Sequence, residues 1–434
     1  MTVPQAALTD IPDPLHIEPV GGPLDATVRV PGSKSVTNRA LVCAALADGT
    51  SMLEGALFAD DTEAMLGVLE ALGVETAVHS EAATMEVVGC AGSPPSSSRV
   101  VDVRQSGTTA RFALPLLALG QGSYRVTAHP QMQARPMGET LEVLGALGCG
   151  VEALGGEGRL PATITAGMKP GVVRVRGDVS SQFLSGLLLA APCVGGEMVI
   201  EVTGDLVSRP YVDLTLAVMA SFGAQVEEIE PQTFVVLPTG YRATRYTVEP
   251  DASAASYPLA AAAICGGRVK VTGLTDRALQ GDVAFADVLA AMGAEVIRDD
   301  GGTEVRRSGG ELSGGRFDLT HFSDTAQTLA VVAPFATSAV TVTGIGFIRR
   351  KEIDRIAAVA RELGRCGVPV TVDDDGWTIA PGRPLPTTFE TYEDHRMAMS
   401  FAVAGLRVPG VVIADEDCVA KSFPDFWERF RLLG

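Results

Sequence analysis

A unit of about 72 residues recurs six times along this chain of 434 residues, and the repeat limits the possible folds more than any other feature. One mark of the unit is a glycine between an apolar segment and a Val-containing segment. Successive copies lie 75, 75, 70, 74 and 67 residues apart. Glycine is expected just past a helix end, because it adopts the left-handed backbone conformation without a steric penalty. The six copies are Gly73, Gly148, Gly223, Gly293, Gly367 and Gly434.

A second series, in step with the first, predicts where buried helices begin. It consists of short polar clusters spaced 71 to 73 residues apart, and each supplies a Ser, Thr or Asp of the kind that caps a helix N-terminus. The segments that follow are apolar on all sides, so we expect their helices to be buried. The clusters lie at Ser35, Thr108, Ser181, Ser253, Asp324 and His395.

The repeats indicate an α/β protein. Each unit also carries an amphipathic second helix, such as residues 61–73, and Val-, Ile- and Thr-rich segments that read as strands. A chain of this length is too long for one ordinary core, so we expect two domains of three units. Residues 33–248 are predicted to form a domain inserted into a second one, made of residues 1–32 and 249–434. A strand before Pro31 would complete the second domain, and crossovers near residues 30–32 and 248–251 would act as the hinge.

Charge and composition exclude several classes of partner. The net charge of −18 and a pI near 4.7 argue against nucleic acid and against an anionic membrane. No signal sequence begins the chain, and no run of 18 or more apolar residues is present. The seven cysteines are scattered and form no C-x-x-C pair, so we expect free thiols in a reducing compartment. These features predict a cytoplasmic protein without a zinc site.

Cations gather at the predicted helix starts, which suggests an anion site. Helix N-termini expose unpaired N–H groups and the positive end of the helix dipole, and both attract phosphate and carboxylate. The repeat would place all these starts on one face of each domain. Two such faces across a cleft would enclose a small ligand with several negative charges. The cations are Lys34, Arg39, Arg135, Lys351, Arg355, Arg396 and Lys421.

Over essentially its whole length the sequence resembles the 5-enolpyruvylshikimate-3-phosphate synthases, a family of enolpyruvyl transferases. The strongest stretches are PGSKSVTNRA, GDVSSQFLSGLLLAAP, GDLVSRPYVDLTL, EPDASAASYPLAAAAI, KEIDR and YEDHRMAMSFAVAG. The resemblance implies a two-domain inverted α/β barrel of six βαβαββ units, three in each domain. It also implies that helix N-termini face the cleft between the domains, in agreement with the repeats.

The resemblance implies an activity and a set of site residues. The reaction joins phosphoenolpyruvate to the 5-hydroxyl of shikimate 3-phosphate, without a metal or cofactor, in a monomeric enzyme. Residues expected to bind shikimate 3-phosphate are Lys34, Ser35, Arg39, Ser180, Ser181, Gln182, Ser208, Tyr211, Asp324 and Lys351, with Arg39 on the carboxylate. Residues expected to bind phosphoenolpyruvate, or the inhibitor glyphosate in its place, are Lys34, Gly107, Arg135, Gln182, Arg355, His395, Arg396 and Lys421.

The family reaction needs one group to accept the hydroxyl proton and another to protonate a carbon. Asp324 is the candidate for the first role and Glu352 for the second, and Lys34 is a candidate for either. The sequence leaves this division open.

Two departures from the family pattern bear on the acceptor. Phe347 and Gln105 stand where many relatives have Asn, so a related phosphorylated cyclitol remains an alternative acceptor. UDP-N-acetylglucosamine is a second alternative, although the loop AHPQMQARP lacks the cysteine usual in transferases that act on it. A different kind of alternative is a non-catalytic repeat scaffold that binds protein partners. Such a scaffold would not need Asp324, Glu352 and His395 beside its cations.

Overall fold

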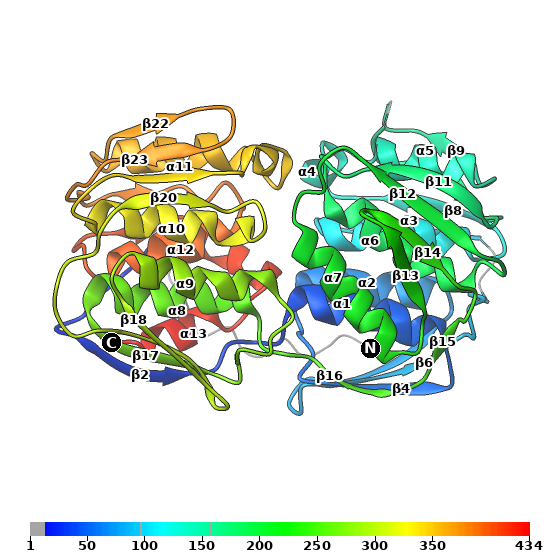
Figure 1. The fold of residues 1–434 in the computed structure, drawn as a ribbon, viewed down its shortest axis with the longest axis horizontal. Coiled ribbons are helices and arrows are strands. Elements are labelled where there is room, and N and C mark those ends of the chain that lie inside the picture. Colours follow the sequence, from blue (N-terminus) through cyan, green and yellow to red (C-terminus); the bar gives the residue numbers. More distant parts are fainter. Residues whose placement is uncertain (1–13, 96–97, 157) are drawn as a thin grey trace.

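Two lobes stand side by side in the computed structural model, which describes residues 14–95, 98–156 and 158–434 (Figure 1). Buried hydrophobic residues form two separate clusters. One draws on residues 36–248, and the other on residues 15–30 and 252–433. We call these parts the inserted lobe and the split lobe.

Two units of the inserted lobe follow the predicted order βαβαββ. The first of them also contains a short extra helix, α4 (Pro130–Gln133), between its second strand and its second long helix. One unit contains β7 (Ser98–Asp102), α3 (Gly107–Ala118), β8 (Ser123–Thr127), α5 (Gly138–Ala146), β9 (Gly150–Ala153) and β10 (Ala162–Thr165). The other contains β11 (Gly171–Arg176), α6 (Ser181–Ala190), β12 (Met198–Thr203), α7 (Arg209–Ser221), β13 (Val226–Glu230) and β14 (Thr233–Val236).

The remaining unit of the inserted lobe takes its first strand from the C-terminal end of the lobe's sequence. That strand is β16 (Arg245–Thr247), which pairs in parallel with β4. The same end also contributes β15 (Tyr241–Arg242), which pairs with β3 (Ala47–Asp48). The unit itself contains α1 (Lys34–Leu46), β4 (Thr50–Glu54), α2 (Asp60–Ala71), β5 (Glu75–His79) and β6 (Thr84–Val88).

The split lobe repeats the plan and draws on the N-terminal segment. The strand expected before Pro31 is β2 (Leu24–Val28), and it pairs in parallel with β17. The first unit of the lobe then contains α8 (Ala252–Cys265), β17 (Gly267–Thr272), α9 (Phe285–Ala291), β18 (Glu295–Asp299) and β19 (Gly302–Arg307). The second contains β20 (Gly315–Asp318), the 3₁₀ helix η3 (Ser323–Thr325), α10 (Ala326–Val332), β21 (Val340–Thr343), α11 (Arg355–Arg365), β22 (Val370–Val372) and β23 (Trp377–Ile379).

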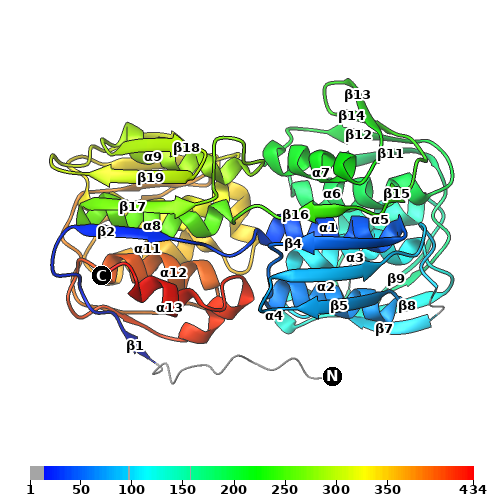
Figure 2. The same ribbon diagram turned by 90° about the horizontal axis from the view of Figure 1, so that it is seen from below.

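The last unit is shorter than the others. It contains β24 (Thr388–Phe389), α12 (His395–Gly405), β25 (Val412–Ile413) and α13 (Phe426–Arg431). The N-terminal strand β1 (Leu15–His16) pairs antiparallel with β25 and fills the place of a missing strand. Figure 2 shows the chain passing from β2 of the split lobe to α1 of the inserted lobe through the first crossover.

The strand order confirms that the units are copies of one design. In five four-stranded sheets the first strand is parallel to the second, and the second is antiparallel to the last, as in β7-β8-β10-β9. Five of the six predicted glycines, all except Gly434, have positive φ angles, from 78° at Gly73 to 109° at Gly293. The predicted α/β fold of six βαβαββ units is therefore confirmed.

The first helix of each unit is buried, as predicted, and the three in the split lobe meet at a ladder of hydroxyl groups. Oγ of Ser256 lies 3.0 Å from Oγ1 of Thr328, which lies 3.3 Å from Oγ of Ser400. The three residues are 72 apart in the sequence. Equivalent positions of successive units thus satisfy one another's polar groups inside the core.

The two crossovers between the lobes are hydrogen-bonded to each other. The N–H of Ser33 donates to the carbonyl of Glu249 at 2.8 Å, and that of Asp251 donates to the carbonyl of Pro31 at 2.9 Å. At Gly32 a Cβ atom would lie 1.9 Å from the carbonyl oxygen of Gly55, so only glycine fits there.

Three predicted helix starts were placed wrongly. Arg135 lies before α5, which begins at Gly138, and Lys351 follows the 3₁₀ helix η5 (Gly346–Arg350) rather than opening α11. Lys421 ends the 3₁₀ helix η6 (Glu416–Lys421). In each case a short turn precedes the second helix, so these three cations approach the lobe interface from connecting segments.

Candidate active site

A cavity of about 850 Å³, partly open to solvent, lies between the lobes and is lined by residues from both of them. Among the described residues it gathers seven cationic side chains and three anionic ones, which favours an anionic ligand. The cations are Lys34, Arg111, Arg135, Arg350, Lys351, Arg355 and Arg396, and the anions are Asp61, Asp324 and Glu352. Polar and aromatic neighbours include Ser35, Gly107, Thr108, Ser180, Ser181, Gln182, Ser208, Tyr211 and Phe347.

Side-chain caps fix several of the helix starts at the cavity. Ser33 caps α1, Ser106 caps α3 and Ser180 caps α6, each by accepting from a backbone N–H within the first turn. In the split lobe Asp354 caps α11 and Asp394 caps α12. The polar clusters of the sequence therefore set the directions from which Lys34, Arg355 and Arg396 reach the cavity.

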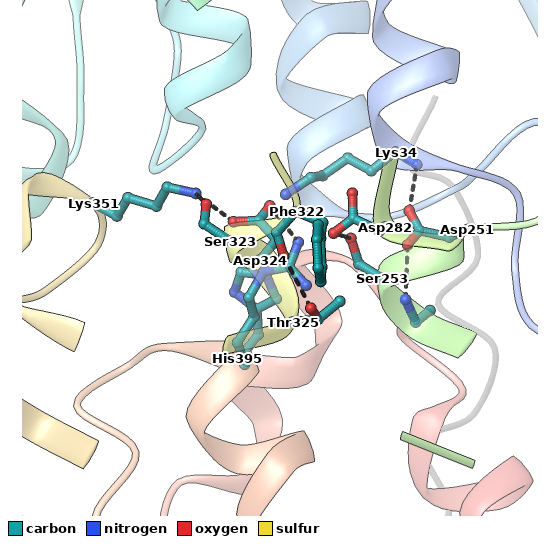
Figure 3. Close-up of polar contacts among 12 residues, drawn as sticks. Lys34, Asp251, Ser253, Asp282, Phe322, Ser323, Asp324, Thr325, Lys351 and His395 are labelled. Atoms are coloured by element: carbon teal, nitrogen blue, oxygen red, sulfur yellow. Dashed lines mark hydrogen bonds and ion pairs between the residues drawn. The ribbon is translucent and has the colours of Figure 1, made fainter. Parts of the chain in front are cut away.

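Asp324 forms ion pairs with three cations, of which Figure 3 labels Lys351. Its Oδ2 accepts from Nη2 of Arg396 at 2.8 Å, and its Oδ1 accepts from Nη1 of Arg355 at 3.3 Å and from Nζ of Lys351. Burial opposes ionisation of Asp324, but the charges of Arg396, Lys351 and Arg355 outweigh it and hold the pKa of the carboxyl well below 3.8. Asp324 is an anion in this arrangement.

Glu352 is held in the same way by two arginines. Its Oε2 lies 2.7 Å from Nη2 of Arg355, and its Oε1 lies 3.4 Å from Nη1 of Arg135 in the other lobe. Burial alone would raise the pKa of the Glu352 carboxyl, but Arg355 and Arg135 hold it well below 4.5. Glu352 is therefore ionised as well.

A third buried carboxylate, Asp61, pairs with two lysines. Its Oδ2 lies 3.1 Å from Nζ of Lys34, and its Oδ1 lies 3.3 Å from Nζ of Lys421, which reaches across from the split lobe. Burial works against the charge of Asp61, but Lys421 and Lys34 lower the pKa of the carboxyl below 3.8. Asp61 was not predicted from the sequence, because it lies in a run of acidic residues typical of an exposed helix start.

Further contacts cross the cleft beside the cavity. The hydroxyl of Tyr211 donates across the cleft to Oδ2 of Asp282 at 2.7 Å. Within the split lobe, Oγ of Ser253 donates to Oδ1 of Asp282 at 3.1 Å (Figure 3). Oγ of Ser208, a residue with a φ angle of 55°, donates to the carbonyl of Thr320 at 3.4 Å. A non-glycine residue in this left-handed conformation is strained and marks a functional site in many proteins.

Three predicted site residues do not line the cavity. Arg39 is 1% exposed and lies behind it, where its guanidinium donates to Oγ1 of Thr215, to Oγ of Ser185 and to the carbonyls of Ser35 and Tyr211. Burial lowers the pKa of Arg39 to about 10.

The other two lie in the split lobe. Lys421 donates to the carbonyl of Gln105 at 2.7 Å. His395 is fully buried, and neither ring nitrogen has a hydrogen-bond partner among the described residues. Burial, together with the charges of Lys34 and Arg396, holds the pKa of His395 well below 6.5, so the ring is neutral.

The family was settled by comparison with known proteins. The family model described as EPSP synthase (3-phosphoshikimate 1-carboxyvinyltransferase) matches residues 19–430. The chain belongs to the EPSP synthase family. A 3-phosphoshikimate 1-carboxyvinyltransferase from Nostoc punctiforme is 46% identical over 96% of this chain and 98% of the relative. One from Aliivibrio fischeri is 42% identical over 96% and 99%.

Solved structures agree with this assignment. An EPSP synthase from Acinetobacter baumannii superposes with a TM-score of 0.79 at 26% identity, over 96% of this chain and 97% of that one. The enolpyruvyl transferase NikO from Streptomyces tendae matches with a TM-score of 0.74 at 22% identity, over 96% of both chains, which shows the fold alone. The predicted family is confirmed.

The two departures from the EPSP synthase pattern lie in different places. Phe347 lines the cavity, and its ring centroid is 5.7 Å from Nζ of Lys351, within the range of a cation–π contact. Gln105 lies outside the cavity, and its side chain donates to that of Gln131. Phe347 alone therefore changes the surface that a ligand meets.

Two negative findings concern the described part of the chain only. No helix there is both long and apolar enough to cross a membrane. Within the same residues, no three His, Cys, Asp or Glu side chains are grouped so that they could hold a metal ion.

Proposed function

We propose that the protein transfers the enolpyruvyl group of phosphoenolpyruvate to the 5-hydroxyl of shikimate 3-phosphate and releases phosphate, on the route to chorismate and the aromatic amino acids. The observation that carries this proposal is the match of the EPSP synthase family model to residues 19–430, which include every residue that lines the cavity. The excess of cations over anions in the cavity suits two substrates that each carry a phosphate and a carboxylate.

The acceptor is assigned to the side of the cavity formed by α1, α6 and the start of α7. Ser180, Ser181 and Ser208, with Tyr211, are proposed to hold its phosphate. Lys34, Ser35, Gln182 and Lys351 complete its site. The carboxylate is assigned to Arg39, whose Nη1 donates to the carbonyl of Ser35 at 2.8 Å, so that binding requires the arginine to exchange this bond.

Phosphoenolpyruvate is assigned to the opposite side, where the arginines gather. Gly107, Arg135, Lys34, Gln182 and Lys421 are proposed around its phosphate. Arg355 and Arg396 are proposed to clamp its carboxylate, because two guanidinium groups match the planar geometry of a carboxylate. His395, which was also predicted to bind phosphoenolpyruvate, precedes Arg396 in α12 and is fully buried.

The reaction is an addition followed by an elimination. The oxygen of the 5-hydroxyl bonds to C2 of phosphoenolpyruvate while C3 takes a proton, which gives a tetrahedral intermediate. Loss of phosphate from C2 and of one proton from C3 then forms the enol ether. Asp324 is proposed to accept the hydroxyl proton, and Glu352 is proposed to exchange the proton at C3. Lys34 lines the same cavity, where Asp61 holds its ammonium group, and it is proposed to assist either step.

Substrate binding is proposed to prepare both carboxylates for proton transfer. Arg355 and Arg396 neutralise Asp324, and Arg355 and Arg135 neutralise Glu352. When the anionic groups of phosphoenolpyruvate engage these arginines, the carboxylates lose part of the positive field that lowers their pKa. Both pKa values then rise, so that Asp324 becomes a better base and Glu352 can carry a proton.

The lobes are proposed to be domains that close on the substrates about the two crossovers. The residues assigned to each substrate come from both lobes, so binding can only be complete when the lobes meet. Small-angle scattering should show a smaller radius of gyration when shikimate 3-phosphate is added. An unchanged radius of gyration would contradict domain closure.

We further propose that the protein is a monomer, because one chain supplies every residue assigned to the site. The scattered cysteines, which form no C-x-x-C pair, support a cytoplasmic location. Sedimentation velocity at increasing protein concentration would reveal a dimer if this were wrong.

The acceptor is tested by phosphate release from phosphoenolpyruvate. Shikimate 3-phosphate should support release with the highest kcat/KM in a panel that also contains other phosphorylated cyclitols and UDP-N-acetylglucosamine. A higher kcat/KM with another cyclitol would assign the protein to a specialised pathway. Transfer to such a cyclitol is the second candidate function, because Phe347 lines the cavity.

A further inference from the structure

Arg350 differs from the other cations that line the cavity. The remaining six each donate to a carboxylate or to a backbone carbonyl, for example Lys34 to Asp61 and Arg111 to Gly107. The side chain of Arg350 makes no hydrogen bond or ion pair with any residue in the described ranges. Its side chain is exposed at the edge of the cavity. Within the part of the chain that the structure describes, it is thus the one lining guanidinium whose donors are all available.

Arg350 faces the other lobe at the start of α6. It is the last residue of η5 in the split lobe, and it shares the cavity wall with Ser180 and Ser181 of the inserted lobe. The pKa of the nearby Asp178 carboxyl is lowered, first by hydrogen bonding to Arg176 and also by the charge of Arg350. Asp178 stands two residues before Ser180, so the positive charge lies close to the proposed phosphate site.

We propose that Arg350 binds the phosphate of shikimate 3-phosphate from the lobe opposite to the serines. This inference rests on the proposed function. The serines and the N-terminus of α6 offer neutral donors, whereas a guanidinium adds charge-assisted hydrogen bonds to phosphate. The other split-lobe cations that line the cavity, Lys351, Arg355 and Arg396, are engaged by Asp324. Arg350 therefore supplies the missing charge and joins the two lobes through the substrate.

The test compares Arg350→Gln with Arg349→Gln. Arg349 belongs to the same 3₁₀ helix but pairs with Asp354 and donates to the carbonyl of Asp373, away from the cavity. Arg350→Gln should weaken shikimate 3-phosphate about 10- to 100-fold in KM and in calorimetric affinity. The affinity for unphosphorylated shikimate and the KM for phosphoenolpyruvate should stay within about threefold, and Arg349→Gln should resemble wild type.

Three results would overturn the inference. Equal losses of affinity for shikimate and shikimate 3-phosphate would show that Arg350 does not contact the phosphate. An increase confined to the KM for phosphoenolpyruvate would assign Arg350 to the other substrate. The same loss of affinity in Asp178→Asn would show that Arg350 acts by attracting Asp178 of the other lobe and not by binding the phosphate. A wild-type protein that releases no phosphate with shikimate 3-phosphate would instead refute the proposed function, before any variant is measured.

Discussion

Nη2 of Arg396 lies 2.8 Å from Oδ2 of Asp324, so a guanidinium proposed to clamp a substrate carboxylate already holds the proposed base. Under the proposed function, the same arginine would serve two carboxylates in turn. While Arg396 holds Asp324, the pKa of Asp324 stays well below 3.8 and the residue is a weak base. In the proposed mechanism, binding of phosphoenolpyruvate transfers the guanidinium of Arg396 to the substrate carboxylate. This exchange links substrate binding to the start of proton transfer.

Replacing Asp324 tests its place in the chemistry. Asp324→Asn keeps the shape of the side chain but removes the base and its charge, so we expect turnover to fall by about 10²- to 10⁴-fold. Steady-state phosphate release measures this loss. Asp318→Asn, in β20 and outside the cavity, is the control. Turnover within about threefold of wild type would remove Asp324 from the mechanism.

Replacing Arg355 should affect stability as well as binding. Its Nε donates to Oδ2 of Asp394 at 2.7 Å, and both side chains are almost fully buried. Arg355→Ala leaves Asp394 without its partner, so we expect the free energy of unfolding to fall by about 3–5 kcal/mol. The KM for phosphoenolpyruvate should rise. Chemical denaturation of Arg355→Ala, Asp394→Asn and the double variant measures the energetic coupling between the two side chains. Additive losses of unfolding free energy would contradict a stabilising Arg355–Asp394 pair.

Gly107→Ala should separate phosphoenolpyruvate from glyphosate. An added Cβ would lie 2.5 Å from Nη1 of Arg135 and 2.8 Å from Nη1 of Arg111, so these side chains must move. Crowding of this kind costs about 1–3 kcal/mol. The inhibition constant of glyphosate, which is longer than phosphoenolpyruvate, should rise more than the KM of the substrate. Equal increases in the two constants would contradict a phosphate contact at Gly107.

Asp282 should make stability depend on pH. Burial, with a contribution from the charge of Asp324, raises the pKa of the Asp282 carboxyl from 3.8 to about 6. Its contribution to folding is therefore fully present below the unfolded pKa and is lost as the pH rises through about 6.

Asp282→Asn keeps an acceptor for Tyr211 and removes this titration. Between about pH 4 and about pH 7 the variant should gain roughly 3 kcal/mol of unfolding free energy relative to wild type. Denaturant unfolding at several pH values measures the difference. A difference that does not change with pH would contradict the assignment.

The fold could be predicted from the sequence because its signals are local. Helix ends and helix starts recur in step, and each unit folds through its own helices and strands. Pairing of distant strands is less visible in the sequence. The contribution of β2 to the split lobe was predicted, whereas that of β16 to the sheet of β4 became clear only in the structure.

The site could be predicted only in part, because a position on a helix does not fix the direction of its side chain. Lys34 and Arg39 belong to the same motif, but Arg39 lies one turn further into α1, where Thr215 and Ser185 turn its guanidinium away from the cavity. Asp61 is the opposite case. It lies in an ordinary acidic run, and only the approach of Lys34 and Lys421 from other segments shows that it belongs to the site.

The central claim is tested most directly by following the carbon skeleton of phosphoenolpyruvate. The protein is incubated with phosphoenolpyruvate labelled with ¹³C at C2, with and without shikimate 3-phosphate, and the products are read by NMR spectroscopy. We predict that the label moves into an enol ether on the 5-oxygen of the acceptor, with one phosphate released for each ether formed and no reaction without the acceptor. Recovery of unchanged phosphoenolpyruvate in both samples, or of labelled pyruvate without an ether, would contradict the account.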